Sequence, residues 1–167
     1  MDVKTACRYH RAMSEPRPHI DIRLVEPADL PAITIIRTSV RENHLSVAEM
    51  TARGITEAGI AAEMAGGNLR GWVALVGGVP AAFSYARRAE GTIFAMFVQP
   101  GFEGLGLGRR LMAAAEDWLF EEGVKEIWLT TDENPAIRAH GFYQRLGWVT
   151  DRTVDAGEVT YWKRRAP

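Results

Sequence analysis

The sequence predicts a mixed α/β (α+β) domain in which helices flank a central, mostly antiparallel sheet. Residues 20–25 alternate apolar and polar side chains, as a half-buried strand does. Two further strand segments surround Gly77-Gly78, which is a strong hairpin signal. Residues 107–119 carry an apolar stripe at helical spacing, which indicates an amphipathic helix. At 167 residues, the chain is long enough for one domain with a full core.

The remaining elements follow from periodicity and from the residues that start and stop them. Pro27 suits the first turn of a helix, and Gly123 suits the end of one. Gly66-Gly67 stops another helix in the same way. The predicted order is β-α-α-β-β-β-α-β-α-β-β. The expected strands are residues 20–25, 72–76, 81–85, 92–98, 126–131, 148–154 and 159–163, and the expected helices are residues 27–41, 57–65, 106–122 and 135–146.

Composition narrows the possible functions. The formal net charge of −1 gives no overall field that would attract nucleic acid or an anionic membrane, so we expect neither as a partner. No apolar run approaches the ~20 residues needed to span a bilayer. Cys7 is the only cysteine, which excludes an intrachain disulfide and suits a reducing, cytoplasmic compartment. The four histidines and Cys7 are scattered, so we expect no metal site.

The chain divides into a short tail and a body. Pro16 and Pro18 separate residues 1–18, which carry no apolar segment of the secretory type, and we expect a flexible N-terminal extension there. Residues 19–167 are expected to form a single domain, because they show no internal repeat or low-complexity tract. The basic end Lys163-Arg164-Arg165 is interpreted as a solvated tail.

The most informative segment is a glycine-rich loop between a predicted buried strand and a predicted helix. Helix N-termini expose unpaired N–H groups and a partial positive charge, and both suit a phosphate. Gly104, Gly106 and Gly108 remove the side chains that would keep a diphosphate away from those groups. A P-loop would require Gly-Lys followed by Ser or Thr, and the GxGxxG fingerprint fails at its last position. The loop therefore predicts a phosphate ligand of another kind.

This loop resembles the GCN5-related N-acetyltransferase (GNAT) superfamily. The signature there is (Gln/Arg)-x-x-Gly-x-(Gly/Ala), usually after Val-x-Pro, and this chain has Glu103-Gly104-Leu105-Gly106-Leu107-Gly108 after Val98-Gln99-Pro100. Glu103 departs from the pattern, and we expect it to point away, because a carboxylate beside a diphosphate is unfavourable. The order of elements also matches that superfamily. The resemblance implies the GNAT fold and acetyl-CoA as acyl donor.

By this resemblance, coenzyme A would contact two neighbouring segments. The backbone of Met96, Phe97 and Val98 would pair with the pantetheine arm like an added strand. The diphosphate would be held by Gly104, Leu105, Gly106, Leu107, Gly108 and Arg109. The alternative for the glycine loop is a plain tight connection between a strand and a helix.

A second segment resembles the family pattern Ala-x-x-Phe-Tyr-x-x-x-Gly-(Phe/Trp). The matching residues are Ala139, Phe142, Tyr143, Gly147 and Trp148. The resemblance implies that Tyr143 protonates the departing thiolate, and a phenol with an ordinary pKa of ~10 is available as an acid at neutral pH. The alternative is a tyrosine that packs the helix against the sheet. The asparagine of many members falls at Ala136 here, and Asn134, two residues earlier, either contacts the cofactor or caps the helix.

The implied reaction is direct transfer of an acetyl group to a primary amine of a small molecule or a protein. The amine must lose a proton, so a base, a water relay or desolvation is needed. Glu90 is the candidate base, two residues before Thr92 on the same strand face, with a solvated strand-end charge as the alternative. A polar cluster near the end of the first helix either selects the acceptor or forms a solvated loop. It comprises Arg37, Arg41, Glu42, Asn43 and His44.

Two other functions stay open. The glycine loop would serve equally well in a non-catalytic CoA-binding sensor or interaction module, and also in a nucleotide-binding regulator. The sequence leaves room for a homodimer in each case.

Overall fold

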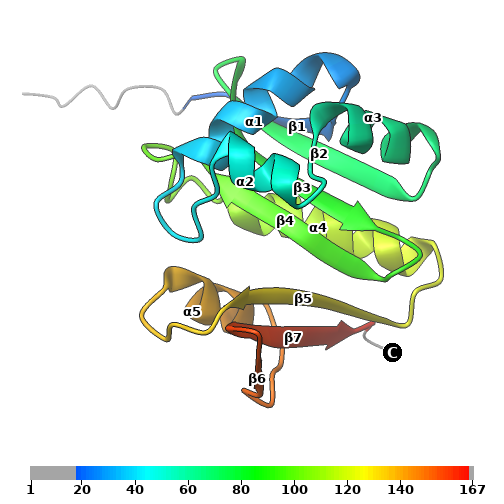
Figure 1. Ribbon diagram of the computed structural model, residues 1–167, viewed down its shortest axis with the longest axis vertical. Coiled ribbons are helices and arrows are strands. Elements are labelled where there is room, and N and C mark those ends of the chain that lie inside the picture. The colour runs from blue at the N-terminus through cyan, green and yellow to red at the C-terminus, as the bar shows by residue number, and fades with distance from the viewer. Residues whose placement is uncertain (1–17, 166–167) are drawn as a thin grey trace, which may run out of the picture.

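The computed structural model describes residues 18–165, which form one seven-stranded sheet with helices on both faces (Figure 1). The strands are β1 (Ile20–Leu24), β2 (Leu69–Val76), β3 (Val79–Arg87), β4 (Thr92–Val98), β5 (Glu126–Asp132), β6 (Val154–Asp155) and β7 (Glu158–Arg164). Their order is β1-β2-β3-β4-β5-β7-β6, and all neighbours are antiparallel except β4 and β5. The predicted mixed, mostly antiparallel sheet is therefore confirmed.

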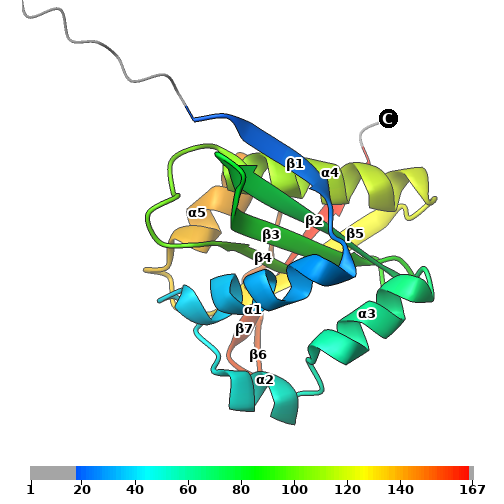
Figure 2. The ribbon, with the colours of Figure 1, turned by 90° about the horizontal axis from the view of Figure 1, so that it is seen from above.

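Helices pack on both faces of this sheet (Figure 2). They are α1 (Leu30–Ser39), α2 (Val47–Ala52), α3 (Glu57–Ala65), α4 (Leu107–Glu121) and α5 (Arg138–Arg145), with a 3-10 turn η1 (Pro27–Asp29) before α1. On one face α1 and α3 bury side chains such as Val73. On the other face α4 and α5 bury Trp72 and Ala74, the residues on either side of Val73 in β2. Because successive side chains of a strand point to opposite faces, β2 contributes to both cores.

Helix α4 anchors the core on its face of the sheet. Leu111, Met112, Ala115 and Leu119 are fully buried. Leu111, Ala115 and Leu119 are four residues apart, and Met112 precedes Ala115 by three, so all four lie on one side of the helix. Burial of each large apolar side chain contributes about 1.5–3 kcal/mol. Leu107, the first residue of α4, is also buried, so the start of the helix packs against the same core.

Strands β4 and β5 pair at one end only. Thr92 lies opposite Trp128, and the Thr92 hydroxyl donates a hydrogen bond to the Trp128 carbonyl at 3.0 Å. The register of β4 against β3 shifts within residues 93–95 and leaves Phe94 as an extra residue, which is a β-bulge. A bulge increases local strand twist. The remainder of β4 therefore turns away from β5, and the sheet opens in its middle.

Helix α2 was not predicted from the sequence. A capping box begins it, in which the Glu49 N–H donates to the Ser46 hydroxyl and the Ser46 N–H donates to the Glu49 carboxylate. The helix has only six residues. Such a length is too short for helical periodicity to show in the sequence.

The final hairpin is shorter than predicted. Residues 148–153 make only an isolated bridge to β7, and β6 begins at Val154. The side chains of Thr150 and Asp151 accept hydrogen bonds from N–H groups two residues further along. These local bonds offer the backbone an alternative to the strand ladder.

The prediction of a solvated basic tail was wrong at Lys163. Its ammonium group donates to the Glu116 carboxylate at 2.6 Å and to the Leu146 carbonyl at 2.8 Å. The Trp148 indole donates to the other oxygen of Glu116 at 2.8 Å. This group ties β7 to α4 and to the end of α5. The predicted extension over residues 1–18 lies outside the described residues, apart from Pro18.

Candidate active site

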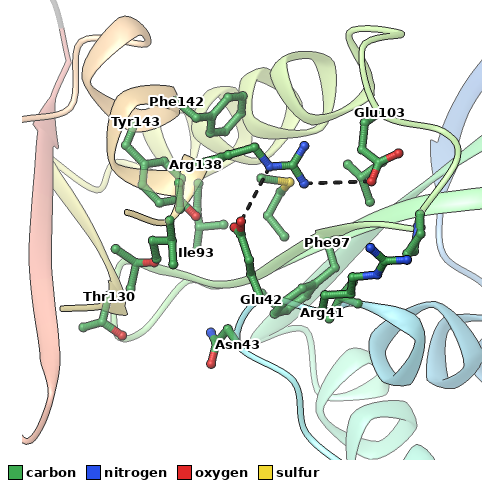
Figure 3. Close-up of a pocket in the computed structure, with 18 of the residues that line it drawn as sticks. Arg41, Glu42, Asn43, Ile93, Phe97, Glu103, Thr130, Arg138, Phe142 and Tyr143 are labelled. Atoms are coloured by element: carbon green, nitrogen blue, oxygen red, sulfur yellow. Dashed lines mark ion pairs between the residues drawn. The ribbon is translucent and has the colours of Figure 1, made fainter. Parts of the chain in front are cut away.

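The separation of β4 and β5 leaves a cavity of about 910 Å³ (Figure 3). Its floor is the edge of β4. Its walls come from the segment after α1, the glycine loop before α4, the end of β5 and the helix α5. The lining residues are 40–43, 93–98, 100, 101, 103, 104, 130, 131, 137–139, 142, 143 and 145.

The floor contains three of the predicted cofactor-binding residues, Met96, Phe97 and Val98. One edge of this part of β4 pairs with β3. Within residues 18–165, the other edge has no strand partner beyond Thr92. Backbone N–H and C=O groups at such an edge need hydrogen-bond partners. An extended ligand that carries amide groups can supply them.

The glycine loop leads from this floor to the first turn of α4. Gly104 and Gly106 each have a φ of +76°, in the left-handed region that glycine adopts without a steric penalty. The first hydrogen bond of the helix runs from the Arg110 N–H to the Gly106 carbonyl. The N–H groups before Arg110 therefore lack helical partners and carry the positive end of the helix dipole.

Gly108 serves a different purpose from the other two glycines. A Cβ atom there would lie 3.3 Å from the Phe142 ring and 3.5 Å from the Met96 sulfur. Its absence lets α4 start close to both α5 and β4. Of the remaining predicted loop residues, Leu107 is buried in the core, whereas Leu105 and Arg109 are exposed.

The expectation that Glu103 points away from the site was wrong. Glu103 lines the cavity, and its carboxylate accepts a hydrogen bond from the Gly101 N–H at 2.7 Å. Hydrogen bonds from the N–H groups of Glu103 itself and of Gly101 lower the pKa of this carboxyl. Arg138, the first residue of α5, lies between two carboxylates, 3.8 Å from Glu103 and 3.7 Å from Glu42 (Figure 3).

Tyr143 lies on α5 and lines the same cavity. Its side chain is packed by the rings of Phe142, Trp148 and Tyr161, and only 8% of the residue is exposed. Burial, with a smaller contribution from Tyr161, raises its pKa to about 12. The phenol is therefore protonated throughout the physiological range. Tyr143 therefore both lines the cavity and packs α5 against its neighbours, which was the alternative prediction for this residue.

Comparison with known proteins identifies the family. The model of the acetyltransferase (GNAT) family matches residues 39–148, which is more than half of the chain. The chain belongs to the GNAT family. A search of curated proteins found no significant match.

Solved GNAT structures share the fold of this domain. The PaiA N-acetyltransferase from Thermoplasma acidophilum, in complex with coenzyme A, superposes with a TM-score of 0.73 at 13% identity, covering 88% of this chain and 99% of that one. The yncA protein from Salmonella typhimurium, with its cofactor acetyl-CoA, gives a TM-score of 0.67 at 20% identity, covering 89% and 98%. An acetyltransferase of the GNAT family from Streptococcus pneumoniae gives 0.64 at 17%, covering 88% and 100%.

Of the six predicted loop residues 104–109 of this GNAT domain, only Gly104 lines the cavity, and the others continue from it into the start of α4. Two further predicted site residues, Glu90 and Asn134, lie elsewhere. Glu90 sits in the turn before β4, where its carboxylate accepts a hydrogen bond from the Asn68 amide at 3.2 Å, and it is not a lining residue. Asn134 is not the cap of α5, because that helix begins at Arg138 with Ile137 as its N-cap. The Asn134 side chain instead accepts a hydrogen bond from an N–H two residues on, as in an Asx turn.

Asn134 lines a second, shallower hollow of about 830 Å³. This outer hollow lies between the α1–α2 segment, the end of β5 and the β6–β7 turn. Its lining residues are Asn43, Arg53, Asp132, Glu133, Asn134, Pro135, Ala156, Gly157 and Glu158. Asn43 lines both the cavity and the outer hollow, and so joins the two.

The predicted polar cluster is only partly a solvated loop. Arg41, Glu42 and Asn43 line the cavity, whereas His44 does not. Arg37 belongs to α1, where it is buried with its guanidinium 4.1 Å from the centre of the Phe97 ring. Burial lowers the pKa of this guanidinium.

The ion pairs of Arg138 were not predicted from the sequence. Arg138 lies five residues before Tyr143, a spacing that does not place two side chains on one helix face. Its carboxylate partners come from distant segments of the chain, so no local pattern indicates them. Across residues 18–165, no group of three or more His, Cys, Asp or Glu converges as a metal ion would require. None of the helices described is long and apolar enough to cross a membrane.

Proposed function

We propose that this GNAT domain, residues 19–167, is an N-acetyltransferase that transfers an acetyl group from acetyl-CoA to a primary amine of a small molecule or protein. One observation carries the proposal. The unpaired edge of β4 leads directly to the unpaired N–H groups at the start of α4. A single extended molecule with amides in one part and a diphosphate in the next satisfies both, and coenzyme A has that composition.

The cofactor would be held mainly by backbone. Its pantetheine amides pair with the free edge at Met96, Phe97 and Val98, and its diphosphate lies over the first turn of α4. A backbone N–H of β4 would also donate to the thioester carbonyl and stabilise negative charge on that oxygen. The thioester then lies in the cavity that Tyr143 lines.

The chemical step would be direct attack by the neutral amine. The nitrogen forms a bond to the thioester carbon, and the carbon–sulfur bond breaks. The departing sulfur takes the phenolic proton of Tyr143, and the resulting phenolate recovers a proton from the nitrogen. One further proton leaves the ammonium before attack and passes to water. The products are an amide, free CoA thiol and one proton.

The amine must be neutral before it attacks. An amine with a pKa of ~10.4 is neutral only about once in 2,500 molecules at pH 7, which costs roughly 4–5 kcal/mol. A group in the cavity that binds the ammonium and provides a path for its proton would concentrate the reactive form. Glu90 does not reach the cavity, so this group must lie elsewhere.

A screen of small amines and of lysine and N-terminal peptides, read by thiol release from acetyl-CoA, tests the proposal. We expect release that depends on an added amine. Tyr143→Phe should lower kcat about 100-fold with little change in CoA affinity, in keeping with the usual contribution of a general acid. Tyr85→Phe is the matched control, because Tyr85 lies in the core on the α1 side. CoA binding without thiol release for any amine would favour a non-catalytic module.

A further inference from the structure

An ion bridge spans the cavity between three separate segments (Figure 3). Glu42 lies after α1, Arg138 begins α5, and Glu103 belongs to the glycine loop. The Arg138 Nε atom is 3.7 Å from Glu42 Oε1, and its Nη2 atom is 3.8 Å from Glu103 Oε1. One cation is thus shared between two carboxylates, one on each side of the cavity.

Both ion pairs of the bridge are weak. Each distance exceeds that of a charge-assisted hydrogen bond, and the Arg138 side chain is 73% exposed. Solvated ion pairs of this kind contribute little, because water and salt screen them. Arg138 can therefore exchange its partners at low cost.

A bound diphosphate would compete for Arg138. Glu103 lies in the loop that would hold this diphosphate. The Arg138 guanidinium, 3.8 Å from Glu103, would therefore be close enough to bind the diphosphate. Guanidinium groups bind phosphate through two parallel hydrogen bonds, which are stronger than a solvated carboxylate pair. Arrival of the cofactor would draw Arg138 toward the phosphates.

The exchange would affect the two glutamates differently. Glu103 keeps its hydrogen bond from the Gly101 N–H. Within residues 18–165, Glu42 has Arg138 as its only charged partner. The next residue, Asn43, lines both the cavity and the outer hollow. Loss of Arg138 therefore leaves Glu42 without an ion-pair partner. Glu42 lies next to the outer hollow, from which a second ligand can enter the cavity.

We propose, on the basis of the proposed function, that Glu42 binds the acceptor ammonium once the cofactor has taken Arg138. In the free protein Arg138 neutralises Glu42. With acetyl-CoA bound, Arg138 pairs with the phosphates, and Glu42 receives the ammonium group of the acceptor. Glu42 accepts one ammonium proton and passes it to water, which leaves a neutral amine to attack the thioester. Donor binding thus prepares the acceptor site.

Calorimetric titration with CoA tests the exchange without turnover. We expect Arg138→Gln to weaken CoA binding about tenfold, as for a lost hydrogen bond to a charged group. Glu42→Gln should tighten CoA binding about two- to threefold, because Arg138 is then less engaged. In Glu42→Gln/Arg138→Gln the tightening should disappear. Arg88→Gln is the control, because it breaks an exposed ion pair with Glu122 outside the cavity.

Titration with n-propylammonium chloride tests the role of Glu42. We expect tighter binding to the CoA-saturated wild type than to the free protein, and a loss of about tenfold in Glu42→Gln. Glu42→Asp, which keeps the charge, should recover part of it. Glu121→Gln, an exposed change on α4, should have no effect.

These titrations test the exchange of Arg138 between Glu42 and the phosphates separately from the proposed acetyltransferase function. Unchanged CoA affinity in Arg138→Gln, or equal ammonium affinity in Glu42→Gln and wild type, overturns the inference. So does ammonium binding that is just as strong without CoA. If wild type releases no thiol with any amine, the proposed function fails, and these titrations still decide whether Arg138 and Glu42 act as inferred.

Discussion

The two sides of the cavity are lined by different kinds of groups. On the proposed donor side, the β4 edge and the glycine loop present backbone N–H and C=O groups. On the proposed acceptor side, the segment after α1 and the end of β5 present side chains, among them Glu42, Asn43 and Thr130. In the loop, exposed backbone requires that side chains be absent, so glycines mark this part of the donor side in the sequence. A side-chain surface depends on residues that the fold gathers from distant segments.

The largest effect should come from filling the donor side. Gly106→Glu places a side chain at a φ of +76° and a carboxylate at the positive end of α4. Left-handed backbone is unfavourable for non-glycine residues by about 1–2 kcal/mol, and the new charge repels phosphate. We expect CoA affinity to fall about 100-fold or more by calorimetry, which corresponds to about 2.7 kcal/mol.

Gly123→Glu is the matched control for this change. Gly123 has a φ of +87° just beyond the C-terminal end of α4, whereas Gly106 is the N-cap of that helix. It should lose stability to a similar degree and keep its CoA affinity. If the two variants bind CoA equally well, the glycine loop is a plain connection and the contrast between the two sides is lost.

A second effect concerns the buried phenol between the two sides. Burial raises the pKa of Tyr143 from about 10 to about 12. The folded state therefore keeps the phenolic proton at a pH where the unfolded chain has lost it. The resulting stability is fully present below pH 10 and is lost as the pH rises from 10 to 12, by up to roughly 3 kcal/mol.

Urea titrations between pH 8 and pH 12 measure this loss. The free energy of unfolding of wild type should fall more steeply above pH 10 than that of Tyr143→Phe. The variant should still show some decline, because burial also raises the pKa of Tyr85. Identical slopes for the two proteins would mean that the Tyr143 hydroxyl is solvated. Turnover by wild type should not fall before pH 10, since Tyr143 stays protonated as an acid.

The sequence predicted the donor side of the cavity better than the acceptor side. The strand, glycine loop and helix at 92–122 were predicted from local patterns, and the structure contains all three. A free edge at residues 96–98 was implied only by the family resemblance, and no local pattern predicted the bulge at Phe94, because a bulge depends on pairing between strands. Capping and turn hydrogen bonds decided the short elements, such as α2 and the segment before β6.

The acceptor side shows why the rest could not be predicted. The position of Glu90 near β4 favoured it as a base, yet the cavity is lined by residues 93–98 of that strand and Glu90 lies in the turn before it. Glu42 and Arg138 lie 96 residues apart in the sequence and meet only because α1 and α5 flank the same opening. No spacing rule connects them. The glycine signature, in contrast, lies within one short segment, so it can be recognised without knowing which distant residues lie nearby.

The smallest effect should come from Glu103, the one residue that departs from the glycine signature. Its carboxylate is in the loop proposed to hold the diphosphate, and Arg138 neutralises it only from 3.8 Å. Glu103→Gln keeps an oxygen that can accept the hydrogen bond from Gly101 and removes the negative charge. We expect CoA to bind about three- to tenfold more tightly, a gain that high salt reduces, because solvated charges are screened.

A comparison of CoA with pantetheine shows whether the gain in affinity comes from relief of repulsion at the phosphates or from a general change in charge. Pantetheine, which lacks the phosphates, should bind Glu103→Gln and wild type equally. Glu133→Gln removes one negative charge at the outer hollow and should leave CoA affinity unchanged. If Glu103→Gln weakens CoA binding instead, the carboxylate helps to hold the glycine loop in its binding conformation. The donor side would then depend on a side chain as well as on backbone, and the difference between the two sides would be smaller than the structure suggests.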